Sequence, residues 1–161
     1  MVVTADSGKL AIALAGPDAT ARLAAALAPL LRAGDVVALE GELGAGKTAF
    51  ARALIRELTG RDEDVPSPTF TLVQTYETAD FDIWHFDLYR LEKPEDAFEL
   101  GIEDAMAEGL TLIEWPDRLG PYLPRGRLTV AIAYGAGETE RVVTLAGGGD
   151  WPARLGALAH G

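Results

Sequence analysis

Hydrophobic residues along this chain follow two patterns that alternate with each other. Short runs of mostly apolar residues predict strands at residues 9–14, 35–40 and 110–113. The middle run contains neighbouring β-branched residues and is typical of a strand that is covered on both faces. Apolar residues spaced three and four apart predict helices over residues 17–34, 48–60, 94–106 and 150–160.

Two of these helices contain a residue that interrupts the pattern. Leu23 and Leu27 belong to the apolar stripe of the first helix, but Pro29 lies inside it. Because proline cannot donate the helical hydrogen bond, we expect a kink or an early end near Ala28. Gly101 is the corresponding point at which the third helix is expected to split.

Strands dominate much of the remaining chain. Residues 70–76 and 82–89 are expected to be strands joined by a polar turn. Residues 128–134 and 141–146 alternate between apolar and polar, with a glycine-rich turn between them, and predict a C-terminal hairpin. Helices interleaved with strands indicate an α/β fold. We expect a central mixed sheet, mostly parallel, in a single domain over residues 1–161.

The composition excludes several kinds of chemistry. The chain of 161 residues has no cysteine, which rules out disulfides, thiolate metal sites and cysteine nucleophiles. Its histidines, His85 and His160, cannot form a histidine-rich zinc site by themselves. Neither a secretion signal nor an apolar run long enough to span a bilayer is visible, so we expect a cytoplasmic protein that does not enter a membrane.

The net charge of the chain limits the classes of molecule that it is expected to bind directly. A formal net charge of −11 argues against unaided binding to nucleic acid or to an anionic membrane. Residues 92–108 alone hold seven acids and one lysine. If Phe98, Ile102 and Ala105 form the inner stripe of a helix there, the acids form either a solvated face or a docking surface for a basic partner.

The strongest chemical signal is the sequence GELGAGKT, which fits the complete phosphate-binding pattern G-x-x-x-x-G-K-[S/T]. It lies between a predicted buried strand and a predicted helix, as such a loop requires. Glycines let the backbone curl around a phosphate, and the helix N-terminus attracts its negative charge. Lys47 is expected to reach the phosphate oxygens, and Thr48 is expected to offer its hydroxyl to Mg²⁺.

This loop predicts a P-loop NTPase-like three-layer sandwich that binds ATP or ADP with Mg²⁺. The expected nucleotide contacts in the loop are Gly41, Glu42, Leu43, Gly44, Ala45, Gly46, Lys47, Thr48 and Ala49. A plain glycine-rich turn is the alternative interpretation.

A site for phosphoryl transfer also needs an acid near Mg²⁺, usually at the end of a neighbouring apolar strand. Glu114 ends the apolar run at residues 110–113 and is the candidate, either as a direct ligand or through water. The alternative is a surface carboxylate at a strand end. Trp115 follows it and is expected to pack on the nucleotide or on a moving loop, or else to be a half-buried core residue.

A second acid, Asp87, is flanked by apolar strand residues, which is unusual unless the acid is paired or functional. It is a candidate to orient the attacking water or a Mg²⁺-bound water. Its alternative roles are an ion pair with Arg90 or a turn cap. His85 lies two residues earlier on the same strand face, where a structural role is the simpler interpretation.

A proline-rich loop follows the helix that is predicted over residues 48–60. In VPSPTF, residues 65–70, Thr69 is placed where nucleotide switches often present a threonine to the γ-phosphate and Mg²⁺. A plain proline turn is the alternative.

These motifs, taken in order, resemble a known family. GELGAGKTAF, SPTF, HFDLYRL, ELG and LIEWP resemble the bacterial TsaE family of tRNA threonylcarbamoyladenosine biosynthesis proteins. The resemblance runs from about Leu27 to Pro116. By matching motif it implies that Lys47 and Thr48 bind phosphate and Mg²⁺, and that Asp87 and Glu114 are the site acids.

The resemblance also implies a function that spacing alone does not indicate. Members of this family are small Mg²⁺-dependent ATPases, weak on their own, that support formation of N6-threonylcarbamoyladenosine in tRNA. They dock on the TsaD–TsaB pair, which performs the transfer, and their ATP hydrolysis is thought to reset that complex. Contact with tRNA is then expected to be indirect, through the complex.

Two other functions stay open at this point. A small-molecule kinase needs an acceptor pocket and usually an arginine-rich lid, whereas the 11 arginines of this chain are scattered. A nucleotide-binding switch that hardly hydrolyses shares the same loop. For the ATPase we expect in-line attack of water on the γ-phosphate, with Lys47 as a catalytic cation and with Asp87 or Glu114 positioning the water.

Overall fold

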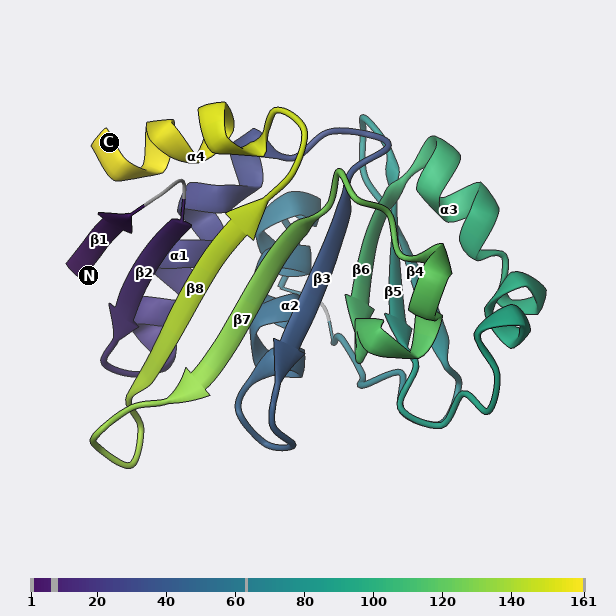
Figure 1. Ribbon diagram of the computed structural model, residues 1–161, viewed down its shortest axis with the longest axis horizontal. Coiled ribbons are helices and arrows are strands. Elements are labelled where there is room, and N and C mark those ends of the chain that lie inside the picture. Colours follow the sequence, from purple (N-terminus) through teal and green to yellow (C-terminus); the bar gives the residue numbers. More distant parts are fainter. Residues whose placement is uncertain (1, 7–8, 63, 161) are drawn as a thin grey trace.

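The strands of the chain form one eight-stranded sheet in a computed structural model that describes residues 2–6, 9–62 and 64–160 (Figure 1). The strands are β1 (Val2–Asp6), β2 (Lys9–Leu14), β3 (Val36–Gly41), β4 (Val73–Glu77), β5 (Asp82–Asp87), β6 (Leu110–Glu114), β7 (Leu128–Tyr134) and β8 (Arg141–Gly147). The α-helices are α1 (Pro17–Leu27), α2 (Lys47–Thr59), α3 (Ile102–Glu108) and α4 (Trp151–His160). Short 3₁₀ helices are η1 (Ala28–Leu30), η2 (Pro94–Leu100) and η3 (Pro116–Tyr122).

The sheet has the strand order β1-β2-β8-β7-β3-β6-β5-β4. Its centre is parallel, because β3 pairs in parallel with β7 and β6, and β6 pairs in parallel with β5. The four outer pairs are antiparallel. The predicted mixed α/β architecture is confirmed, but the parallel share is smaller than expected. The short connections β1–β2, β4–β5 and β7–β8 are long enough for hairpins and too short for parallel crossovers.

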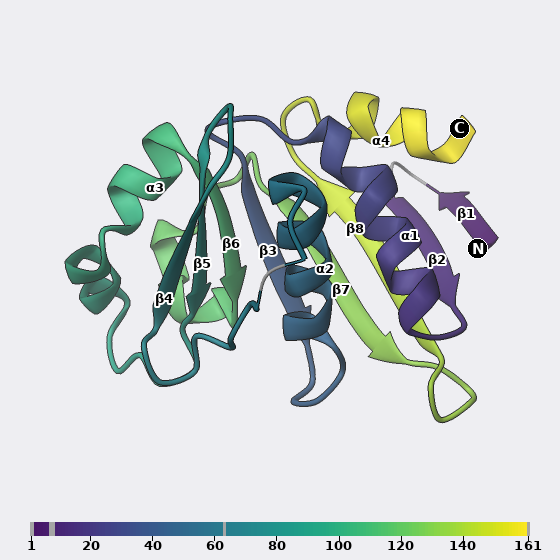
Figure 2. The same ribbon diagram turned by 180° about the vertical axis from the view of Figure 1, so that it is seen from behind.

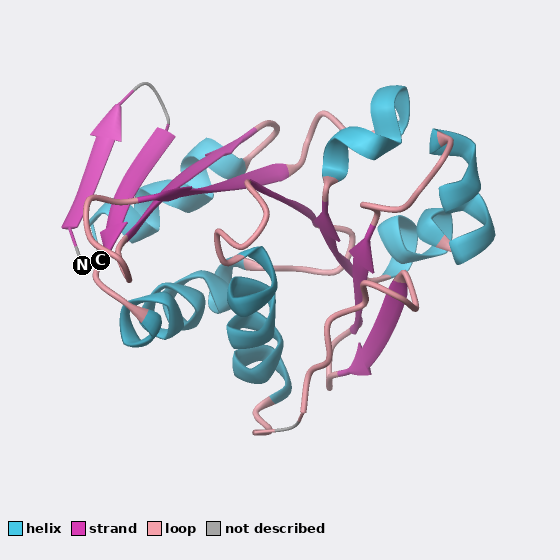
Figure 3. Ribbon diagram, turned by 90° about the horizontal axis from the view of Figure 1, so that it is seen from below, coloured by secondary structure: helices cyan, strands magenta, loops and turns pink. Residues whose placement is uncertain are grey.

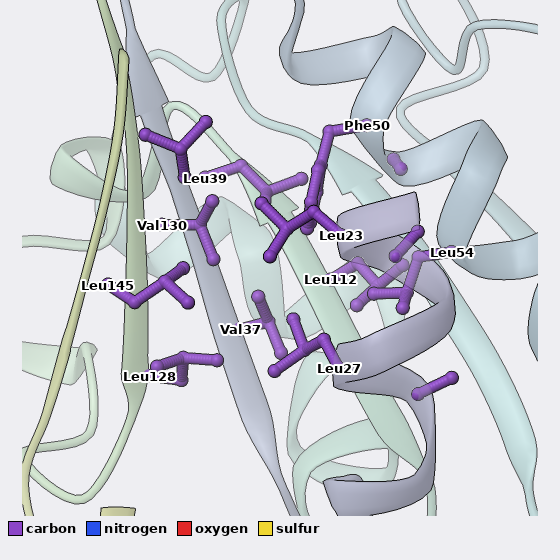
Figure 4. Packing of buried hydrophobic residues seen from close by; sticks show 14 of the residues in the cluster. Leu23, Leu27, Val37, Leu39, Phe50, Leu54, Leu112, Leu128, Val130 and Leu145 are labelled. Carbon is purple, nitrogen blue, oxygen red and sulfur yellow. The ribbon is translucent and has the colours of Figure 1, made fainter. Parts of the chain in front are cut away.

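Helices cover both faces of this sheet, which makes three layers (Figures 2 and 3). Helices α1 and α2 lie on one face, and α3 with η2 and η3 lies on the other. The larger core, on the α1–α2 side, packs Leu23, Leu27, Phe50 and Leu54 against the sheet (Figure 4). Among the helices that the structure describes, none has the length and apolar character that crossing a membrane requires.

The two interruptions predicted for the helices are present. Helix α1 ends at Leu27 and continues as the 3₁₀ helix η1, which contains Pro29. Gly101 has a φ of 83° and separates η2 from α3, a left-handed conformation that favours glycine. The expected helix over residues 94–106 is therefore two short helices of different type.

The prediction that Phe98 belongs to the buried face of that segment is wrong. Ala97 is fully buried, whereas Phe98 is 37% exposed and packs edge-on against Tyr122. The reason is that residues 94–100 form a 3₁₀ helix, whose three-residue turn shifts the buried face by one position. Ile102 and Ala105 are buried as expected, and the acids Glu99 and Glu103 are exposed.

The C-terminal helix is fastened to the start of the central strand β3 by an ion pair. Arg154 of α4 donates from Nη1 and Nη2 to the Asp35 carboxylate at 2.6 and 3.0 Å. Both side chains are only about a tenth exposed. Hydrogen bonding to Asp35 raises the pKa of Arg154 further above its usual range, against the opposing effect of burial. This bidentate contact links α4 to the residue that precedes β3.

Removing this cation is expected to destabilise the protein. Arg154→Ala leaves a nearly buried carboxylate without its bidentate partner, so the free energy of unfolding should fall by about 3 kcal/mol, measured by urea denaturation. The matched control is Arg32→Ala, which removes an ion pair to Asp150 whose arginine is 65% exposed, and should cost less than about 1 kcal/mol. Equal small losses in both variants would contradict the anchoring role of Arg154.

Candidate functional site

The phosphate-binding loop connects the carboxyl end of β3 to the start of α2, as its motif predicts. Gly41 has a φ of 152°, and a Cβ there would lie 2.6 Å from the Ile132 carbonyl oxygen of the neighbouring strand β7. Gly46 has a φ of 115° and forms the N-cap of α2. These two positions need glycine because one lacks space and both have positive φ.

Lys47 lies under the loop rather than in solvent. Its side chain is 5% exposed, and its Nζ donates to the carbonyl oxygens of Gly41 at 2.6 Å and Glu42 at 2.9 Å. Burial lowers the pKa of Lys47, and the carboxylates of Glu114 and Asp87 oppose that shift. The ammonium is thus a desolvated cation placed between the loop and the site acids.

The two acids come together through the parallel pairing of β5 and β6. Asp87 and Glu114 are register partners at the carboxyl ends of these strands, and they are only 5% and 3% exposed. Thr48 Oγ1 donates to Glu114 Oε1 at 2.8 Å, which joins the start of α2 to the end of β6. The structure therefore brings Lys47, Thr48, Asp87 and Glu114 to one edge of the sheet.

The proline-rich loop reaches the same place. Thr69 Oγ1 donates to Asp87 Oδ2 at 3.2 Å and lies 2.7 Å from the Ser67 hydroxyl. The other oxygen of Asp87 accepts the backbone N–H of Tyr89 at 3.0 Å. Arg90 does not take the role of ion-pair partner to Asp87, because its guanidinium lies over the ring of Phe70, 4.6 Å from the centroid. Asp87 is held by hydroxyl and backbone donors instead.

Trp115 lies against the site, beside the ammonium of Lys47. Its φ of 58° is a left-handed conformation that is unusual for a bulky residue and marks local strain. The Lys47 ammonium is 4.2 Å from its ring centroid, and the ring of Tyr89 packs on it at 4.9 Å. The strained backbone after Glu114 thus places an aromatic face beside the buried cation.

These side chains enclose a pocket of about 200 Å³. It is lined by Leu43, Gly44, Gly46, Lys47, Thr48, Ala49, Thr69, Asp87, Glu114 and Trp115. Among the residues predicted to contact nucleotide, Gly41, Glu42 and Ala45 do not line this pocket, and Ala45 lines a larger neighbouring groove instead. The other predicted site residues all line the smaller pocket.

A larger groove of about 920 Å³ continues from the loop between α1, α2 and the β7–β8 hairpin. It shares Gly46 and Ala49 with the smaller pocket. Its walls include Pro17 at the start of α1, Ala53 on α2 and Thr139 in the hairpin. The two spaces therefore lie next to each other at the start of α2.

Sequence reasoning missed two residues that hold the loop in shape. Tyr134 Oη donates to the Leu43 carbonyl at 3.1 Å, and Arg141 Nε donates to the Ala45 carbonyl at 2.9 Å. We call this pair the hairpin brace. Tyr134 lies 91 residues along the chain from Leu43, and Arg141 lies 96 residues from Ala45, so no local sequence pattern predicts these contacts.

The polar groups at this edge fit Mg²⁺. Thr48, Asp87 and Glu114 offer only oxygen donors, which this hard cation prefers. Within the part of the chain that the structure describes, no group of three or more His, Asp or Glu side chains is arranged to hold a metal ion by itself. A Mg²⁺ ion at this edge would need its remaining ligands from phosphates and water.

Comparison with known proteins agrees with this geometry. The family model "Threonylcarbamoyl adenosine biosynthesis protein TsaE" matches residues 14–143. The chain is 49% identical over 100 residues to the tRNA threonylcarbamoyladenosine biosynthesis protein TsaE of Rickettsia felis, covering 62% of this chain and 58% of that protein's length. It is 36% identical over 135 residues to the TsaE of Bacillus subtilis, covering 83% of each.

A solved structure extends the similarity to the whole fold. The crystal structure of Bacillus subtilis YdiB superposes with a TM-score of 0.79 at 30% identity, over 99% of this chain and 97% of that one. The family model spans the phosphate loop, both site acids and the β7 strand behind the loop. The resemblance seen in the sequence motifs is therefore confirmed, and the chain belongs to the TsaE family.

Proposed function

We propose that this chain is a cytoplasmic Mg²⁺-dependent ATPase that supports threonylcarbamoyladenosine modification of tRNA. The observation that carries the proposal is the meeting of Lys47, Thr48, Asp87 and Glu114 around one small pocket beneath a complete phosphate-binding loop. A cation, a hydroxyl and two carboxylates beside a helix N-terminus are the groups that phosphoryl transfer from a nucleotide needs.

In this proposal, different groups of the chain bind the phosphates and the Mg²⁺. The loop backbone and the N-terminus of α2 would hold the β- and γ-phosphates, and the Lys47 ammonium would turn from the loop carbonyls to phosphate oxygens. Thr48, Glu114 and Asp87 would hold Mg²⁺, directly or through water. When bound, Mg²⁺ would neutralise the phosphate oxygens and favour in-line displacement.

The hydrolytic step requires a positioned water. Water attacks the γ-phosphorus, the bond to the β,γ-bridging oxygen breaks, and ADP, phosphate and a proton are released. Asp87 or Glu114 would accept a hydrogen bond from that water. Thr69, hydrogen-bonded to Asp87, would place the proline-rich loop beside the γ-phosphate.

The larger groove is the proposed site for the adenosine part of the nucleotide. The groove of about 920 Å³ begins at Gly46 and Ala49, at the start of α2. Its volume lies within the range of small-ligand sites, and its walls at Pro17, Ala53 and Val143 are apolar, which suits a planar base. We assign ribose and base to this groove.

Membership of the TsaE family supports the biological part of the proposal. The relatives are named for tRNA threonylcarbamoyladenosine biosynthesis. We propose that this chain acts on a TsaD–TsaB complex, and that tRNA is reached through that complex, because a net charge of −11 disfavours direct binding to an anionic polymer.

The proposal as a whole is tested by phosphate release from Mg-ATP. We expect slow release by the chain alone and strong stimulation by the cognate TsaD–TsaB pair, measured with a coupled phosphate assay. Transfer of phosphate to an acceptor instead of water would indicate a kinase. Tight binding of ATP without turnover in either condition would indicate a nucleotide switch, and both results would overturn the ATPase proposal.

Lys47→Ala should weaken ATP binding by about 100-fold, because hydrogen bonds to charged groups contribute about 3 kcal/mol. Isothermal titration with a non-hydrolysable ATP analogue measures this. The matched control is Lys93→Ala, at an exposed lysine outside the pocket, which should bind as the wild type does. Unchanged affinity in the Lys47 variant would remove the phosphate-binding role of the loop.

Glu114→Gln should reduce Mg²⁺-dependent turnover by about 100-fold or more while changing nucleotide affinity much less, since the carboxylate charge is lost but the side-chain volume is kept. Steady-state kinetics beside binding titrations separate the two effects. Glu99→Gln, at an exposed acid of η2, is the control. Wild-type turnover by the Glu114 variant would exclude this acid from the site.

A further inference from the structure

One buried polar group in the site region has no role in the proposal above. His85 lies in the middle of β5, is fully buried, and faces the same side of the sheet as Asp87. Its Nε2 is 2.7 Å from Glu114 Oε2. In the part of the chain that the structure describes, its other ring nitrogen, Nδ1, has no hydrogen-bond partner.

This contact completes the hydrogen bonding of Glu114. One carboxylate oxygen accepts from Thr48 Oγ1 at 2.8 Å, and the other faces His85 at 2.7 Å. An ionised carboxylate is an acceptor only, so the imidazole must carry its proton on Nε2 to bond with it. The carboxylate is therefore held from two elements, with α2 on one side and β5 on the other.

A histidine at this position is costly for packing alone. The neighbouring inward-facing residues of the same strands, Ile83 and Leu112, are fully buried hydrocarbons, and an apolar side chain would fill such a place without leaving a polar atom unpaired. His85 instead leaves Nδ1 unpaired in order to present Nε2 to Glu114. The benefit that offsets this cost is the fixed direction of the carboxylate.

We infer that His85 is a positioning residue that fixes the Glu114 carboxylate in the orientation needed to receive Mg²⁺. This inference rests on the proposed function, since it concerns how the proposed Mg²⁺ site is built. His85 touches neither nucleotide nor metal and acts only through Glu114. Outer residues that orient a metal-binding carboxylate commonly change metal affinity or activity by roughly 10- to 100-fold when they are replaced.

The test compares ADP affinity with Mg²⁺ and with excess EDTA, using isothermal titration of the full chain. For the wild type we expect tighter binding with Mg²⁺. His85→Leu fills the space but removes the donor, so it should lose roughly tenfold of that Mg²⁺-dependent gain while affinity in EDTA stays unchanged. His85→Gln, whose amide nitrogen reaches a similar position to Nε2, should keep most of the gain.

Ile83→Val is the matched control, because it alters packing on the same strand and face without touching Glu114. It should lower the melting temperature and keep the wild-type gain. The inference is overturned if His85→Leu keeps the gain, if it loses affinity equally in Mg²⁺ and in EDTA, or if His85→Gln loses as much as His85→Leu. A wild type that shows no Mg²⁺-dependent gain would instead overturn the proposed Mg²⁺ site itself.

Discussion

The site depends on the parallel pairing of β3, β6 and β5. Parallel strands end at the same edge of a sheet, and here the register sets Leu39 beside Glu114 and Glu114 beside Asp87. The phosphate loop leaves β3 at that edge, so its threonine bonds directly to Glu114, and its lysine lies near enough to both acids for their charges to act on it. A slip of one residue between β5 and β6 would turn Asp87 or Glu114 to the opposite face.

Much of the fold was predictable because its signals are local. Apolar runs predicted β3 and β6, and the positions of Pro29 and Gly101 predicted where helices end. Strand β1 and the 3₁₀ helix η3 were not predicted, and the exposure of Phe98 was predicted wrongly. A 3₁₀ helix and an α-helix of similar composition differ in their buried face, and the choice between them depends on packing that a single sequence does not show.

The residues of the candidate site also fall into those that the sequence predicted and those that it did not. Lys47 and Thr48 follow from a contiguous motif, and Glu114 follows from its place at the end of an apolar strand. His85 was interpreted as a structural residue, since nothing near it in the sequence names a partner 29 residues away. The hairpin brace was missed entirely for the same reason. Sequence patterns thus identify the motif residues of the site better than the residues that hold them in place.

The hairpin brace has a consequence for how the phosphate loop acquires its shape. The phosphate-binding motif is complete by Thr48, yet two of the carbonyls that define its shape are held by Tyr134 and Arg141, from strands formed by the last third of the chain. A nascent chain still emerging from the ribosome has the motif but not its support, and closing so long a stretch of backbone costs conformational entropy that only docking of the hairpin offsets. The shape of the loop is in this sense a property of the chain folded through β8, and the contiguous motif alone does not set it.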